Sequence, residues 1–241
     1  MKKIVTIAIT VIIFWASFSS CQKDIVVGNG PVVTETRSLN NFRGVSYKVP
    51  GKVNFKIDPV YKVAISAQRN ILDVLRSDIV NGVLIIDFKN NVRAKKHEDI
   101  IVNITAPSAD YFSVSGVGDM IVEGDLVSDN LSLNISGVGN IFIQKATVND
   151  KINADISGSG NMDVTAGSAK REELRISGSG NMDLSQVPAE KAETHISGSG
   201  DMKVNLSQSL DAYISGSGTV YYRGRPAINT HISGSGNVKS L

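Results

Sequence analysis

Cysteine is nearly absent from this chain of 241 residues, in which Cys21 is the only one. A single thiol excludes an internal disulfide framework, and it leaves no set of thiolates that could hold a structural metal. The folded part must therefore be stabilised by packing, and we expect no metal and no other cofactor.

An excess of charge of one sign is also lacking. The chain has 25 Lys and Arg against 23 Asp and Glu, and Lys2 and Lys3 belong to a leader segment described next. Without that leader the formal charge is zero, so no basic stripe is available to a phosphate backbone. The composition therefore argues against nucleic acid as a partner.

The one long apolar run lies at the N-terminus. Residues 4–18 follow two lysines and end at Ser19-Ser20, directly before Cys21. A basic start and an apolar run shorter than a membrane span are typical of a secretory signal peptide. Phe18-Ser19-Ser20-Cys21 resembles a lipobox, which implies that Cys21 is acylated and becomes the first mature residue. We predict a lipoprotein signal peptide over 1–20 and a flexible, lipidated tether over 21–31.

A four-residue repeat dominates the C-terminal half. Ser-Gly-Ser-Gly or Ser-Gly-Val-Gly occurs seven times at intervals of 18 to 21 residues. The copies begin at Ser115, Ser136, Ser157, Ser177, Ser197, Ser215 and Ser233. Apolar and polar residues alternate on both sides of each copy, which is the pattern of a strand with one buried face. Each repeat is therefore predicted to be a strand, a tight glycine bend and a second strand.

Stacking is the economical way to bury these strands, because no single repeat can cover its own apolar row. We predict an all-β fold in which residues 112–241 form a right-handed parallel β-helix of about seven coils. The residue after each second glycine should then line one corner as a hydrogen-bonded polar ladder. Its members are Asp119, Asn140, Asn161, Asn181, Asp201, Thr219 and Asn237.

Residues 32–111 lack the repeat but are rich in β-type sequence. Strands are predicted over 45–47, 53–57, 61–65, 83–86 and 100–104, with turns at Pro50-Gly51, Asp58-Pro59 and Asn81-Gly82. A short helix is predicted over 70–77. Since an exposed end of a solenoid needs covering, we expect this β-rich region to cap the first coil.

One outward column of the predicted β-helix is a candidate ligand face. It contains Ser113, Asn134, Asp155, Arg175, His195, Tyr213 and His231, and it is chosen on polarity alone, with Asp155, Arg175, His195, Tyr213 and His231 as the candidate ligand contacts. An ordinary solvated surface is an equally open interpretation. His195 and His231 lie two coils, or about 10 Å, apart, which is too far to share a zinc ion.

These features together resemble a known family. Asn70-Ile71-Leu72 before a strand, followed by repeated Ile-Ser-Gly-Ser-Gly-Asn, is similar to the putative auto-transporter adhesin head domain family, also called the head GIN domain. The resemblance covers about residues 42–238. It implies a β-helical fold in exported, often lipid-anchored proteins of Bacteroidetes, and it supplies no catalytic residues.

Three classes of function remain open. The favoured one is a noncatalytic surface adhesin, lipid-anchored on the outer membrane, that contacts glycans or surface proteins. Gln22-Lys23-Asp24 resembles the signal that sends such lipoproteins to the cell surface. A carbohydrate-active enzyme would need a walled cleft, and the clearest clusters, Asp155 beside Arg175 and Asp163 beside Asp183, have no loop insertion to form one. The third class is a periplasmic envelope scaffold or a lipid-handling component, which an amphipathic groove would indicate. The oligomeric state is left open.

Overall fold

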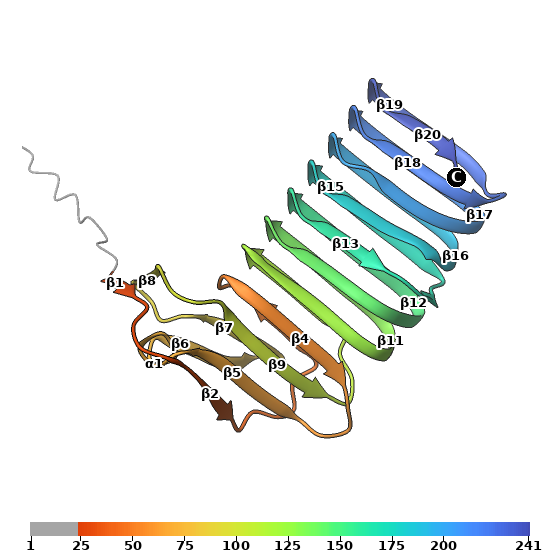
Figure 1. The fold of residues 1–241 in the computed structure, drawn as a ribbon. Helices are drawn as coiled ribbons and strands as arrows, with labels where there is room; N and C mark the ends of the chain where they lie inside the picture. The colour runs from red at the N-terminus through yellow and green to blue at the C-terminus, as the bar shows by residue number, and fades with distance from the viewer. Residues whose placement is uncertain (1–23) are drawn as a thin grey trace, which may run out of the picture.

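The computed structural model describes residues 24–241, and the fold over this range is all-β. Strands from β10 onward stack as parallel coils into a rod with a β-rich region at one end (Figure 1). The rod consists of β10 (Tyr111–Gly116), β11 (Gly118–Gly137), β12 (Asn140–Gly158), β13 (Asn161–Val164), β14 (Gly167–Ser168), β15 (Arg171–Gly178), β16 (Asn181–Gly198), β17 (Met202–Gly216), β18 (Thr219–Gly224), β19 (Ala227–Gly234) and β20 (Asn237–Ser240).

The predicted β-helix is confirmed, with about six turns instead of seven. The seventh glycine corner is followed only by β20, so its coil is not completed. Neighbouring coils pair in register, and equivalent isoleucines such as Ile156, Ile176 and Ile196 are stacked in one buried column. The alternating sequence therefore forms one continuous aliphatic core along the rod.

Glycine is required at both positions of the corner. Gly158 has φ +137°, a backbone conformation that residues with a Cβ rarely adopt, and a Cβ there would also lie 2.2 Å from the carbonyl oxygen of Gly137. Gly160 has no such conformation, but a Cβ there would lie 2.0 Å from the carbonyl oxygen of Gly139 in the preceding coil. The repeated motif thus allows the backbones of successive coils to touch at this corner.

Polar side chains follow the corner as a hydrogen-bonded ladder. Asn140 donates from Nδ2 to Asp119 Oδ1 at 2.7 Å, and Asn161 and Asn181 continue with Nδ2 to Oδ1 bonds of 3.0 Å each. Asp201 and Thr219 join through their backbone amides. Asn237, which pairs with Thr219, instead donates to the Ser235 carbonyl oxygen at 3.2 Å.

The N-terminal region contains ten short elements. They are β1 (Asp24–Val27), β2 (Val32–Arg37), β3 (Gly44–Tyr47), β4 (Gly51–Ile57), β5 (Lys62–Gln68), α1 (Arg69–Leu72), β6 (Leu75–Val80), β7 (Val83–Phe88), β8 (Val92–Lys95) and β9 (Ile100–Ala106). The five predicted strands are all present. The helix predicted over 70–77 is reduced to the single turn of α1, because residues from Leu75 onward pair antiparallel with β7.

This region both extends the rod and closes its end. β3 and β4 pair in parallel with β10 and β11, and β7 and β9 pair in parallel with β3 and β4. The coil of β3 and β4 therefore lies between the coil of β7 and β9 and that of β10 and β11, although β7 and β9 follow β4 in the chain. Beyond them β5, β6 and β2 run antiparallel and end the stack. The regions predicted over 32–111 and 112–241 share one 18-stranded sheet.

The flexible tether expected over 21–31 is not seen from Asp24 onward. Residues 24–27 form β1, which pairs in parallel with β8 at the capped end (Figure 1). The signal peptide, Cys21 and Lys23 lie outside the described residues. Among residues 24–241, no helix has the length and apolar character needed to cross a membrane.

Candidate ligand-binding face

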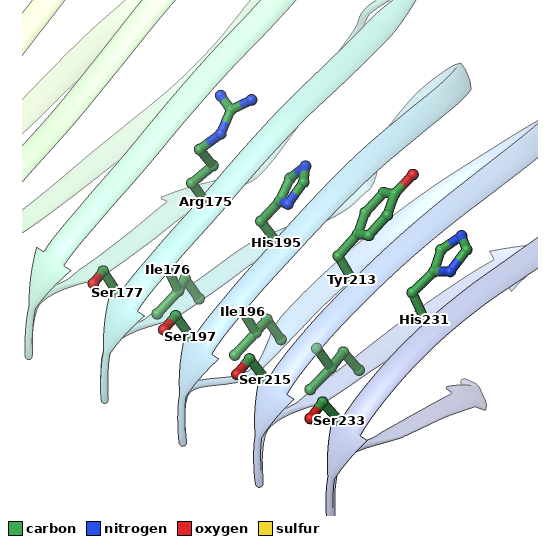
Figure 2. A pocket seen from close by; sticks show the side chains of 11 residues that line it. Arg175, Ile176, Ser177, His195, Ile196, Ser197, Tyr213, Ser215, His231 and Ser233 are labelled. Carbon is green, nitrogen blue, oxygen red and sulfur yellow. The ribbon is translucent and has the colours of Figure 1, made fainter.

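The strand that precedes each glycine corner presents a flat outward face. Its side chains alternate between core and solvent, and the parallel register places equivalent outward positions directly beside one another. Arg175, His195, Tyr213 and His231 occupy one such position in four successive coils, and we call them the ring column (Figure 2). Asp155 is at the equivalent position of the coil before Arg175.

The three rings of this column are stacked on one another. The ring centroids of His195 and Tyr213 are 4.7 Å apart with planes 4° from parallel, and those of Tyr213 and His231 are 4.7 Å apart at 9°. The spacing is close to the distance between adjacent strands, so the coil repeat itself sets the stack. The ring faces are used within the column, and the nitrogen and hydroxyl edges point outward (Figure 2).

A shallow groove of about 350 Å³ runs beside the ring column. The rings and Arg175 stand along one side, and the short side chains of Ser177, Ser197, Ser215 and Ser233 lie next to them at the glycine corner (Figure 2). The difference in side-chain height between the two columns produces the groove. A chain-like ligand lying along it would meet a serine hydroxyl in every coil and a different polar side chain of the ring column in each.

A third column, formed by Glu173, Glu193, Asp211 and Asn229, contacts the two imidazole rings. Glu193 Oε1 lies 2.6 Å from His195 Nε2, and Asn229 Nδ2 lies 3.3 Å from His231 Nε2. Further along, Lys151 donates to Glu173 at 3.0 Å. Nowhere in residues 24–241 do three His, Cys, Asp or Glu side chains come together as a metal site.

The Asp163 and Asp183 pair lies across the corner from the ring column, beside Lys203. Asp183 accepts hydrogen bonds from Lys203 Nζ at 2.8 Å and Ser185 Oγ at 2.6 Å. Partial burial raises the pKa of Asp163, and the charge of Asp183 adds to this. Burial also acts to raise the pKa of Asp183, but the bonds from Lys203 and Ser185 outweigh it and the pKa is lowered. Asp183 is therefore held by this network as a structural ion pair.

Glu172 is a site that the sequence analysis missed. It occupies an inward position between Ile152 and Ala192, and it is 1% exposed. Within the described residues neither carboxyl oxygen has a hydrogen-bond partner. Burial raises its pKa well above the ordinary value, which favours the protonated, uncharged form of the side chain. The signal was present in the sequence, since a glutamate replaces an aliphatic residue in the alternating pattern.

The repeated coils and flat outward face define a parallel β-solenoid of the kind that presents an extended surface. The chain belongs to the family described as "Putative auto-transporter adhesin, head GIN domain", which matches residues 41–226. The resemblance inferred from the repeated motif is thereby confirmed.

Several solved structures have this fold. A putative adhesin from Bacteroides fragilis is 25% identical with a TM-score of 0.81, covering 90% of this chain and 100% of that one. A putative adhesin from Parabacteroides merdae is 22% identical with a TM-score of 0.73, covering 90% and 99%. A protein described as a putative lipid binding protein from Parabacteroides distasonis is also 22% identical with a TM-score of 0.73, covering 90% and 100%. No curated protein matches the sequence.

Proposed function

We propose that the mature protein is a noncatalytic adhesin of the cell envelope that is lipid-anchored through Cys21 and binds an extended glycan along the ring column. The stacked rings beside the serine groove are the observation that carries this proposal. Phenol and imidazole edges, serine hydroxyls and carboxylates are hydrogen-bonding partners suited to sugar hydroxyls. The serine hydroxyl recurs in every coil of the groove, which suits a repetitive ligand better than a single small molecule.

A shallow groove contributes little binding free energy for each sugar unit, so useful affinity requires contacts with several coils at once. The test is binding of the purified mature protein to a panel of polysaccharides and glycoproteins. Tyr213→Ala should abolish binding, because it removes the middle ring of the stack. Tyr221→Ala is the matched control, since Tyr221 lies across the corner in the column of Lys203. Equal binding by both variants would show that the ring column is not the site.

Protease accessibility on intact cells tests the location. An outward-facing protein is digested on intact cells, whereas a variant with Lys23→Ala and Asp24→Ala should be protected if these residues direct export to the surface. Cys21→Ala should release the protein from the membrane fraction. If the wild type is digested only after lysis, the adhesin proposal fails and a periplasmic scaffold becomes the better account.

A further inference from the structure

The first described residues of the chain are fixed to the capped end of the rod. Besides the β1–β8 ladder, the amide of Asp24 donates to the Asn91 carbonyl oxygen at 2.6 Å and that of Gly28 to the Lys95 carbonyl oxygen at 3.3 Å. β1 and β8 lie together at the end of the molecule opposite the last coils (Figure 1).

Two side chains near α1 clamp this segment. Asn70 donates from Nδ2 to the Val27 carbonyl oxygen at 2.7 Å and accepts from the Asn29 amide at 3.1 Å. Gln68 donates to the Gly30 carbonyl oxygen at 3.1 Å. Gly28 fits closely beneath them, because a Cβ there would lie 2.0 Å from Gln68 Oε1. Asn70 of the Asn70-Ile71-Leu72 motif thus holds the segment that leads to the proposed anchor.

Chain length then limits how far β1 can lie from an acylated Cys21. Asp24 is three residues further along, and three extended residues span at most about 11 Å. The head-group region of one leaflet is itself roughly 5 to 8 Å deep. An anchor at Cys21 therefore brings β1 and its partner β8 to the membrane surface.

The outward side of this strand pair has the chemistry of an interfacial surface. Ile25 and Val27 are 58% and 51% exposed, and the register places them directly beside Arg93 and Lys95, which are also exposed. Neither cation forms an ion pair within residues 24–241. Apolar side chains next to unpaired cations suit the boundary between acyl chains and phosphate head groups.

We propose that Ile25, Val27, Arg93 and Lys95 form an anchor face that lies on the phosphate-bearing head groups beside the lipid anchor. The rod then projects from the membrane in a fixed orientation, with the cap at the surface and the ring column further out. This inference rests on the proposed lipidation of Cys21, and it adds a second contact that the lipid alone does not require.

The test compares single cysteines in the lipidated full-length protein. Ile25→Cys and Val127→Cys are matched, because the native side chains are 58% and 57% exposed. In open envelope fragments, a maleimide coupled to polyethylene glycol should label the Ile25→Cys protein at least about fivefold more slowly than the Val127→Cys protein. In detergent the two rates should be equal.

A second part of the experiment reverses the two positive charges of the anchor face. Adding Arg93→Glu and Lys95→Glu to the Ile25→Cys protein should restore fast labelling in the envelope fragments. Lys56→Glu with Lys62→Glu is the control, since it changes the net charge equally on exposed side chains of β4 and β5. Equal labelling of the Ile25→Cys and Val127→Cys proteins in envelopes would overturn the anchor face. Metabolic labelling with radioactive palmitate separates this outcome from a failure of lipidation, because an unlabelled wild type would refute the anchor itself.

Discussion

At the residue scale, the corner glycines allow two constraints to be measured separately. Gly160 has no left-handed backbone conformation, but a Cβ there would meet the Gly139 oxygen at 2.0 Å. Gly116 has φ +104° and nothing within 4 Å of an added Cβ. We expect Gly116→Ala to cost about 1–2 kcal/mol of the free energy of unfolding through backbone strain. Gly160→Ala should cost about 3 kcal/mol or more, because two backbones must separate.

Urea unfolding followed by circular dichroism measures both free energies. A cost for Gly116→Ala equal to or above that for Gly160→Ala would mean that backbone conformation, rather than the contact between coils, fixes glycine in this motif.

A second prediction at this scale concerns Glu172. Its pKa in the folded state is raised by burial above the ordinary value of 4.5, so the folded protein keeps a proton that the unfolded chain loses as the pH rises. Stability from this group is thus complete below pH 4.5 and falls as the pH rises toward the raised pKa. The fall approaches about 1.4 kcal/mol per pH unit within that window.

Glu172→Gln removes the titrating group and nearly preserves its shape. We expect the free energy of unfolding of this variant, measured in urea from pH 5 to pH 8, to decline less with pH than that of the wild type. Parallel curves for the two proteins would show that Glu172 is hydrated or ion-paired in solution, contrary to its burial in the structure.

At the element scale, one six-residue sequence occurs in two coils that differ in burial, so the effect of burial on stability can be measured with the local sequence held constant. His-Ile-Ser-Gly-Ser-Gly occurs at residues 195–200 and again at 231–236, yet Ile196 is 2% exposed and Ile232 is 43% exposed. Ile196→Ala should destabilise the protein by about 2–5 kcal/mol, because it opens a cavity in the core. Ile232→Ala should cost about 1 kcal/mol or less, since a coil covers it on one side only. Similar unfolding midpoints for the two variants would show that Ile232 is buried in solution.

The strands of the rod could be predicted because every coil has the same alternation of apolar and polar residues around the same glycine corner. The alternation around Ile156 or Ile196 fixes the inward face, and counting residues back from each corner places Arg175, His195 and Tyr213 in one line. Ring stacking depends on side-chain rotamers, which spacing alone does not determine. In the cap no period indicates the partner of each strand, so the placement of β3 and β4 outside chain order could not be derived.

At the scale of the whole molecule, the two ends of the solenoid differ. The cap end is closed by antiparallel strands and the β1–β8 pair, whereas every residue of β19 is exposed. In a stacked structure each coil contacts only its neighbours, so local opening should begin where one neighbour is missing. The rod should therefore lose order progressively, from β19 and β20 toward the cap.

Amide hydrogen exchange measures this gradient directly. We expect β19 and β20 to exchange fastest among the rod strands, β17 to be intermediate because it lies next to them, and β11 and β12 to exchange slowest because they lie farthest from the open coil. The order should hold across protein concentrations if the rod is monomeric. Protection of β19 that rises with concentration would indicate that a second copy covers the open coil, because an exposed strand edge and Ile228 and Ile232 together offer it a template for pairing. Uniform protection at high dilution would instead mean that the rod opens as a single cooperative unit, and that coupling along the aliphatic core outweighs the missing neighbour.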